Sequence, residues 1–382
     1  MVLFDRVIPA EFSRVGSAGN LPIIPPPTAE FSIMRPFNIP ESVFKATLEP
    51  RFPITAALLY VVVVGALNKY NRLRDAKPWP ISKRPWFSKF VIMHNSLLAV
   101  YSAWTFCGMV GVLRRTLVSP GGAAGLSATY DSLCRIHGPA GLGRSIYFDE
   151  TLGRWTSVDA EVSFAAMNGT YPLSMPSGRI WSEGMAYYGW LFYVSKLYEF
   201  LDTFIILAKG KESSFLQIYH HSGVLVGTWL GYRVMASPAW ILVLFNSFVH
   251  SLMYTYYVSR GISIRVPIAI KQSLTLLQIV QFVVGGVFGV IHFFIEFDNP
   301  TIAAMTKLYG DDDDASPSIM SAEARQPCMI SSTERLTAAL GIVSLIPLTW
   351  LFVMFFISNY LKNHPRKVEF QKNRISSMKK DS

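Results

Sequence analysis

FYVSKLYEFLDTFIILAK at residues 192–209 and FLQIYHHSGVLVGTWLGY at residues 215–232 are the two segments that decide how this chain folds. Each is apolar and nearly long enough to cross a bilayer as a helix. Both carry polar or ionisable side chains where a lipid-facing helix would carry leucine: Lys196, Glu199, Asp202, Gln217, His220 and His221. Such groups are costly in a membrane and normally face a protein interior or a wet cavity. The two segments therefore predict a functional site inside a membrane protein.

The composition of the whole chain is that of a membrane protein. Of its 382 residues, 51% are hydrophobic and 16% are charged, and the mean hydropathy is +0.31. Soluble domains usually carry about 25% charged residues. We therefore expect an all-α membrane protein with seven transmembrane helices. Their expected limits are residues 54–67, 90–113, 186–208, 215–232, 238–258, 266–297 and 336–361.

The basic residues orient these spans. They concentrate in the loop after the first span and in the tail at residues 362–382, which places both in the cytosol by the positive-inside rule. An odd number of spans then puts the proline-rich arm at residues 1–52 in the lumen. That arm has no cleavable signal and is expected to be poorly ordered. The long loop at residues 114–185 and the acidic loop at residues 298–335 become lumenal as well.

Several short signals agree with this topology. Asn168 begins a glycosylation sequon in a lumenal loop. Cys134 and Cys328 both fall in lumenal loops, where an oxidising compartment permits a disulfide, although spacing alone leaves their pairing open. Lys379 and Lys380 form a dilysine signal typical of retrieval to the endoplasmic reticulum. The net charge of +10 lies in membrane-flanking loops, which argues against nucleic-acid binding.

Polar side chains from four consecutive spans fall at similar depth. With a rise of about 1.5 Å per residue, Asp202 and His220 each lie roughly 9 to 10 Å from the cytosolic end of their spans. His250 lies roughly 13 Å inward, with Asn246 one turn deeper, and Thr275 lies at a comparable depth in the next span. One lone membrane histidine is usually a core residue, whereas this convergence favours a site.

Four ordered motifs carry a resemblance to a known family. Residues 196–203 match the KxxExxDT box of the fatty-acid elongase (ELO) family, and residues 217–221 resemble its HxxHH box with Gln217 in the first place. Residues 246–257 match NxxxHxxMYxYY, and residues 275–282 match TxxQxxQF. The resemblance implies a very-long-chain 3-oxoacyl-CoA synthase of the endoplasmic reticulum. It also implies that spans two to seven form a six-helix barrel around an acyl tunnel open to the cytosol.

The resemblance implies roles for individual residues. His220 is expected to form an acyl-imidazole intermediate, with His221, His250 and Asn246 orienting the thioester or stabilising an enolate. Glu199 and Asp202 are expected to fix the histidine tautomers. Substrate and coenzyme A are expected to contact Lys196, Thr203, Tyr254, Tyr256, Lys271, Thr275, Gln278, Gln281 and Lys362.

The same resemblance sets the expected substrates and partners. They are acyl-CoA and malonyl-CoA, with no cofactor and no metal, together with membrane lipid and the reductases and dehydratase of the elongation cycle. Homo- or heterodimer formation stays open. Gln217 is a variant associated with elongases of polyunsaturated chains. Chain length is expected to depend on the lumenal end of the tunnel, near residues 285–292.

Two other classes of protein stay open. Clustered histidines also occur in membrane di-iron desaturases and hydroxylases, which have three histidine boxes with eight or more ligands. This chain has seven histidines, and His137 and His364 lie outside the spans. A seven-helix receptor or transporter is the non-enzymatic alternative, although polar residues near the cytosolic face fit a midplane transport site less well.

Overall fold

The computed structural model describes residues 23–121, 125–142, 144–150, 153–157, 178–298 and 325–362. The helices are α2 (Glu41–Leu48), α3 (Arg51–Leu73), η2 (Pro80–Lys83), α4 (Pro85–Thr116), α5 (Gly125–Cys134), η3 (Trp181–Met185), α6 (Ala186–Tyr198), α7 (Phe200–Ala208), α8 (Phe215–Arg233), α9 (Ala239–Gly261), α10 (Ile268–Ile291), α12 (Ser332–Phe356) and η4 (Ile357–Lys362). Two antiparallel hairpins complete the fold, β1 (Ile146–Asp149) with β2 (Arg154–Ser157) and β3 (Glu296–Asp298) with β4 (Arg325–Pro327).

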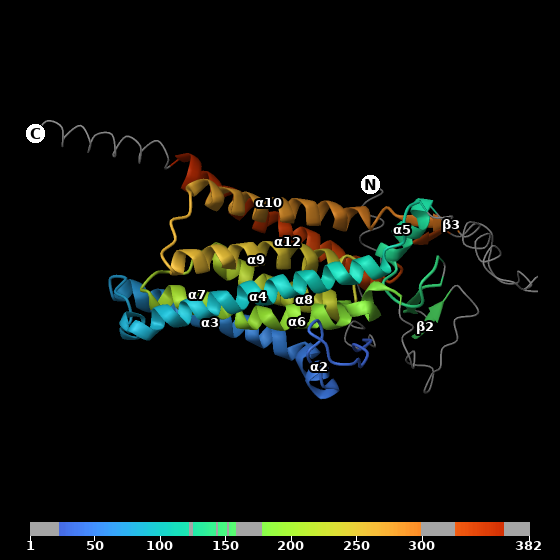
Figure 1. Ribbon diagram of the computed structural model, residues 1–382, viewed down its shortest axis with the longest axis horizontal. Helices are drawn as coiled ribbons and strands as arrows, with labels where there is room; N and C mark the ends of the chain where they lie inside the picture. The colour runs from blue at the N-terminus through green and yellow to red at the C-terminus, as the bar shows by residue number, and fades with distance from the viewer. Residues whose placement is uncertain are drawn as a thin grey trace, which may run out of the picture.

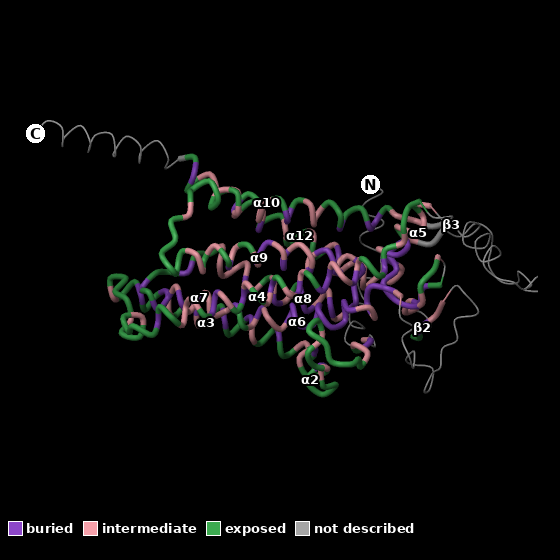
Figure 2. Tube along the Cα trace, viewed as in Figure 1, coloured by how far each residue is buried: buried purple, intermediate pink, exposed green. Residues whose placement is uncertain are grey.

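The long helices lie side by side along one axis (Figure 1). Six helices form a closed ring in which each helix contacts the next, in the order α4, α9, α10, α12, α8 and α6. The ring closes where α6 contacts α4. The helix α3 packs outside this ring against α7 and α8. We call the end that carries α5 and both hairpins the disulfide end, and the opposite end the α7–α8 end. Figure 2 shows that α6 is largely buried, whereas α10 and α12 are largely exposed or half-buried.

Within the described residues, five helices are long and apolar enough to cross a membrane. They are α3, α4, α9, α10 and the segment from Ser332 to Leu361. Helix length and composition therefore support a multi-pass membrane protein. They identify five spans among the described residues and not the seven transmembrane helices expected from the sequence. The third expected span is divided between α6 and α7 at Glu199, and the polar residues of α8 lower its hydropathy.

The expectation of a poorly ordered N-terminal arm is wrong for the part that is described. Ile24, Phe44 and Leu48 are buried in the main hydrophobic core of the bundle. The prolines leave this segment with little helix, but the favourable free energy of burying these apolar side chains holds it against the bundle. Residues 1–22 lie outside the described part.

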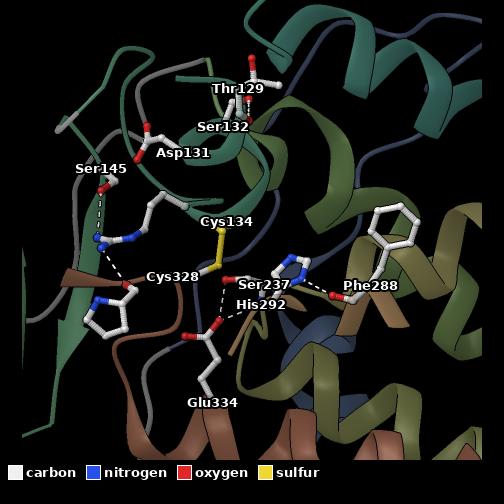
Figure 3. The surroundings of a disulfide bond; sticks show 12 residues. Thr129, Asp131, Ser132, Cys134, Ser145, Ser237, Phe288, His292, Cys328 and Glu334 are labelled. Carbon is white, nitrogen blue, oxygen red and sulfur yellow. Dashed lines mark hydrogen bonds between the residues drawn. A yellow bond between two sulfur atoms is a disulfide. The ribbon is translucent and has the colours of Figure 1, made fainter. Parts of the chain in front are cut away.

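The disulfide end is held by a covalent link and by polar contacts. Cys134, at the end of α5, and Cys328, ahead of α12, form a disulfide with their Cα atoms 5.2 Å apart (Figure 3). The neighbouring Glu334 carboxylate accepts hydrogen bonds from the backbone and hydroxyl of Ser237, at 2.7 and 2.6 Å. Asn168, the acidic stretch at residues 311–314 and the lysines at 379 and 380 lie outside the described residues.

Candidate active site

Two cavities meet inside the helix bundle. The larger, about 580 Å³, is lined by histidines, carboxylates, tyrosines and amides towards the α7–α8 end, and we call it the polar chamber. The smaller, about 200 Å³, runs along α8 past glycines and aliphatic side chains, and we call it the apolar chamber. His220, Gln281 and Phe282 line both cavities. His220 therefore stands at the boundary between a polar and an apolar compartment.

The first turn of α8 sets the direction of its histidines. Ser214 caps the helix by accepting a hydrogen bond from the Gln217 backbone at 3.2 Å. One turn later in the helix, the Nε2 atoms of Gln217 and His221 lie 2.8 Å apart. The Gln217 amide also donates to Thr203 Oγ1 at 3.4 Å. Gln217 thus fixes the imidazole of His221, which projects into the polar chamber.

His220 is surrounded by rings. Its imidazole centroid lies 5.6 Å from that of His221, at an interplanar angle of 89°, and 6.2 and 6.5 Å from the rings of Phe352 and Phe282. Its Nδ1 atom is buried and has no hydrogen-bond partner among the described residues. A buried nitrogen without a partner is costly, so it is a candidate for pairing with a bound substrate.

The break between α6 and α7 places a buried ion pair beside α9. The Lys196 ammonium lies 2.8 Å from Glu199 Oε1 and 3.1 Å from Asn246 Oδ1. The other oxygen of Glu199 lies 3.7 Å from His250 Nδ1. Lys196 is 1% exposed, lines neither cavity and lies over the Phe192 ring at 4.1 Å. Lys196 therefore lies outside both cavities and positions Glu199 and Asn246, while its expected contact with substrate or coenzyme A stays a prediction.

Asp202 is held between three helices. His94 Nε2, on α4, lies 2.9 Å from Asp202 Oδ1, and the Tyr254 hydroxyl, on α9, donates to Asp202 Oδ2 at 2.5 Å. The Tyr198 hydroxyl lies 3.2 Å from His94 Nδ1. Asp202 therefore orients His94 and Tyr254, while Glu199 is the carboxylate that approaches a chamber histidine. His94 thus makes a hydrogen bond between helices α4 and α7.

Thr203 also lines neither cavity. It is fully buried and lies 2.8 Å from the Tyr60 hydroxyl of α3. Sequence reasoning missed this contribution of Tyr60, since the first span carried no motif. Lys196, Glu199 and Thr203 are spaced at i, i+3 and i+7, which predicts that they share one stripe of a helix. This spacing could not say which neighbouring helix the stripe meets.

The remaining expected residues line the polar chamber near the α7–α8 end. This set consists of Tyr254, Tyr256, Lys271, Thr275, Gln278 and Gln281. Thr275 Oγ1 lies 3.3 Å from the Tyr360 hydroxyl, and the Lys271 ammonium lies 5.5 Å from the Tyr360 ring centroid. Lys209 and Arg260 line the same chamber and were not singled out from the sequence. The side chain of Lys362 lies outside the described part.

Glycines give the apolar chamber its width. Gly223 and Gly227 follow His220 on α8, and a Cβ atom at either position would meet no atom within 4 Å. The same holds for Gly285, on the facing helix α10. Larger side chains at these positions would project into the cavity. Residues 285 and 289 of the expected tunnel-end segment line this chamber.

Among the described residues of the polar chamber, no three metal-ligand atoms from different side chains lie within 4.8 Å of one another. Within the described residues, the three ligand-type side chains whose atoms lie within 4.8 Å of one another are Cys134, His292 and Cys328, at the disulfide end. Their two cysteines are already joined in the disulfide.

The fold and the site define a multi-pass helical membrane protein in which a histidine-rich polar chamber opens into an apolar one. The family comparison agrees with this class: residues 46–368 match the ELO family, described as the GNS1/SUR4 family. The chain belongs to this family.

Named relatives are fatty acid elongases. The chain is 35% identical over 114 residues to long chain fatty acid elongase 1 of Caenorhabditis elegans, covering 30% of this chain and 40% of that protein. It is 32% identical over 123 residues to human very long chain fatty acid elongase 3, covering 32% and 46%. It is 26% identical over 189 residues to fatty acid elongase 2 of Trypanosoma brucei brucei, covering 49% and 60%. The matched stretches thus span less than two thirds of each of these three relatives.

Proposed function

We propose that this protein condenses a long-chain acyl-CoA with malonyl-CoA, giving 3-oxoacyl-CoA, coenzyme A and carbon dioxide. The observation that carries the proposal is the position of His220 between the polar and the apolar chamber. A thioester at this boundary would have its acyl chain among the glycines of α8 and its coenzyme A among polar groups. The names of the relatives, all fatty acid elongases, support the same reaction.

The first half of the reaction is acyl transfer to the protein. An imidazole nitrogen of His220 attacks the thioester carbonyl carbon, the carbon–sulfur bond breaks, and the proton of the imidazole passes to the leaving thiolate. The product is an acyl-imidazole and free coenzyme A. Because the apolar chamber excludes water from the acyl chain, the intermediate is protected from hydrolysis.

The second half forms the new carbon–carbon bond. Malonyl-CoA loses carbon dioxide, and the resulting enolate attacks the acyl carbon, which releases the His220 nitrogen. His221, His250 and Asn246 lie around this position on α8 and α9, and their donors can stabilise the developing oxyanions. Net uptake of one proton returns His220 to its neutral form, which closes the cycle.

The basic and aromatic rim of the polar chamber is suited to the nucleotide of coenzyme A. Lys271, Lys209 and Arg260 can pair with its phosphates, and Tyr256 offers a ring for stacking. Gln217 cannot titrate, so its part is to hold His221 and not to move a proton. We associate this glutamine with polyunsaturated acyl substrates.

The proposal includes an arrangement in the cell. The six helices α4, α6 with α7, α8, α9, α10 and α12 form a barrel around the acyl tunnel, and α3 makes a seventh pass. The α7–α8 end faces the cytosol and the disulfide end faces the lumen of the endoplasmic reticulum. The reductases and dehydratase of the elongation cycle would then act on the product.

Membranes that contain the protein test this reaction when incubated with an acyl-CoA and labelled malonyl-CoA. We expect labelled 3-oxoacyl-CoA, and we expect His220→Ala to abolish it. Ser222→Ala is the matched control, because among the described residues the Ser222 hydroxyl bonds only within α8, to Ile218 O at 2.7 Å and Tyr219 O at 3.5 Å. Full turnover in His220→Ala would remove the acyl-imidazole step. Stoichiometric iron with desaturated products, or substrate transport without any product, would replace the proposal by one of the other two classes.

A further inference from the structure

A segment ahead of the first long helix is fastened to the bundle by aromatic side chains. We call residues 23–48 the N-terminal strap. Six oxygen atoms of the strap accept hydrogen bonds from tryptophan and tyrosine side chains of the bundle. Trp181 donates to Ile24 O (2.9 Å), Trp104 to Ile33 O (3.0 Å), Tyr188 to Met34 O (2.7 Å), Tyr193 to Thr47 O (2.7 Å), Trp190 to Thr47 Oγ1 (2.9 Å) and Trp229 to Leu48 O (2.9 Å). The donors are indole and phenol groups of α4, η3, α6 and α8. Most of the acceptors are backbone carbonyls.

These hydrogen bonds matter because of where the strap lies. Trp104 lies nine residues before the end of the expected span at residues 90–113, which is about 14 Å at 1.5 Å per residue. Since the hydrocarbon of a bilayer is about 30 Å thick, Trp104 falls in the half of the membrane at the disulfide end. Irregular backbone at this depth is tolerated only when its polar groups are paired within the protein. The aromatic donors pair five backbone carbonyls of the strap in this way.

The strap has a buried side and an exposed side. Ile24, Phe44 and Leu48 turn inward and join the core. The residues from Phe31 to Phe37 form a turn closed by paired backbone hydrogen bonds between Ser32 and Arg35, both 3.0 Å. The large apolar side chains left exposed on the strap are Phe31 (75%), Ile33 (89%), Met34 (37%), Phe37 (44%) and Val43 (43%).

This exposed side continues the lipid-facing surface of the neighbouring helices. Trp104, which holds Ile33, shares α4 with the exposed residues Leu97 and Val100. The helix α3 begins three residues after the strap and exposes Ile54 and Leu58. Both helices are apolar enough to span the membrane. The apolar side chains of the strap therefore extend a surface that lipid already covers.

Two charged residues of α2 form the exposed polar part of the strap. Glu41 and Lys45 pair at 2.6 Å on the outer face of α2, and both side chains are about two-thirds exposed. The Arg35 guanidinium does not reach solvent freely, since it lies 5.0 Å from the Tyr187 ring centroid and bonds Pro27 O. The strap thus carries exposed apolar residues in the segment from Phe31 to Phe37 and an exposed ion pair on α2, a combination that suits a membrane–water interface.

We propose that the N-terminal strap is an interfacial membrane anchor. Phe31, Ile33 and Phe37 insert among the phospholipid acyl chains of the leaflet at the disulfide end, while Glu41 and Lys45 face water. Apart from Trp104 on α4, the aromatic residues that hold the strap belong to η3, α6 and α8, which contribute to the wall of the apolar chamber. Phe44 lies against Tyr232 of that wall, with ring centroids 6.1 Å apart. The proposal concerns membrane contact and does not depend on the condensation chemistry.

Site-directed spin labelling in lipid nanodiscs tests the anchor on the full chain. Cys107 is the chain's one cysteine outside the disulfide, so Cys107→Ser supplies the background for a nitroxide on Ile33→Cys. The readout is the collision rate with oxygen, which partitions into hydrocarbon, relative to that with a water-soluble nickel chelate. Val100→Cys on α4 is the lipid-facing reference, and Lys45→Cys on α2 is the water-facing reference.

We expect the oxygen-to-nickel ratio at Ile33 to match that at Val100 and to exceed that at Lys45 by at least about threefold, because apolar surface favours hydrocarbon over water. A ratio at Ile33 equal to that at Lys45 would overturn the proposal. Dipolar broadening between labels on neighbouring copies would also overturn it, since a second copy of the chain would then cover the strap. A second variant, Phe31→Asp with Ile33→Asp, should release the strap from the membrane, so that added protease cleaves it several-fold faster. Glu41→Gln is the control for this variant and should leave the cleavage rate unchanged.

Discussion

His94 Nε2 on α4 lies 2.9 Å from Asp202 Oδ1 on α7, and the two residues lie 108 positions apart in the chain. The second oxygen of Asp202 accepts from Tyr254 on α9. A single carboxylate therefore joins three of the helices that enclose the polar chamber. Because Asp202 lines the chamber and His94 is fully buried behind it, the pair links the packing of α4 to the shape of the site.

The first prediction concerns this pair. His94→Ala should lower the free energy of unfolding by about 1–3 kcal/mol, because it leaves an oxygen of Asp202 without its donor in a largely buried position. His94→Gln keeps a donor at this place and should lose less. Thermal unfolding in detergent micelles measures the difference. Equal losses in the two variants would show that the ring of His94 matters through packing and not through its hydrogen bond.

The second prediction concerns Gln217 and His221, whose Nε2 atoms lie 2.8 Å apart. Gln217→Ala should lower kcat about fivefold, since a lost neutral hydrogen bond of about 1 kcal/mol lets the His221 ring turn away from its working position. KM should change little, because Gln217 holds a histidine and not the coenzyme A. Steady-state kinetics with one acyl-CoA separates the two constants. A total loss of turnover, as large as in His220→Ala, would mean that Gln217 takes part in the chemistry directly.

The control for Gln217→Ala lies just ahead of the same helix. Glu212→Gln removes a carboxylate that makes an exposed ion pair with Arg72 at 3.0 Å, and it does not line the chamber. Exposed ion pairs contribute little, so this variant should keep wild-type kcat and KM.

The convergence of His220, His221 and His250 on one chamber follows from the sequence because helical rise alone fixes depth. The direction in which the side chains of Lys196 and Thr203 point could not be predicted from the sequence. Their stripe on the α6–α7 segment is clear, but whether it meets a cavity or a neighbouring helix depends on packing against α3 and α9. The part of the strap ahead of α2 could not be predicted either, since residues 23–40 have no helical or strand periodicity. Its order comes from donors such as Trp181 and Trp104, far away in the chain.

The third prediction concerns the glycines of the apolar chamber. Gly227 lies seven residues past His220 on α8, about 10.5 Å along the helix. Gly227→Leu should fill the open space at this depth and shorten the longest acyl chain that is accepted. Gly223→Leu, about 4.5 Å from His220 along the helix, should shorten it further. Product profiles across acyl-CoAs of different length measure the effect.

Gly65 on α3 is the matched control for these variants. A Cβ atom there also meets nothing within 4 Å, but Gly65 lines neither cavity. Gly65→Leu should therefore leave the product profile unchanged. Unchanged profiles in all three variants would show that the acyl chain does not run along α8.

The fourth prediction concerns pH and the start of α12. Glu150 accepts hydrogen bonds from the hydroxyls of Ser331 and Ser332 and, at 3.1 Å, from the backbone of Thr333. Partial burial alone would raise the pKa of Glu150, but these hydrogen bonds favour the charged carboxylate, and the net result is a pKa below its ordinary value. A negative charge at the N-terminus of a helix is also favoured by the helix dipole.

A carboxyl group whose pKa is lower in the folded than in the unfolded chain stabilises the fold above its unfolded pKa. That contribution is lost as the pH falls through the folded pKa. Glu150→Gln should therefore lower the Tm at neutral pH, and its gap from wild type should narrow as the pH falls below about 4.3, the ordinary value for glutamate. Thermal unfolding across this range tests the sign. A gap that stays constant with pH would show that the charge of Glu150 does not stabilise α12, and that the loss in Glu150→Gln comes from shape and neutral hydrogen bonding.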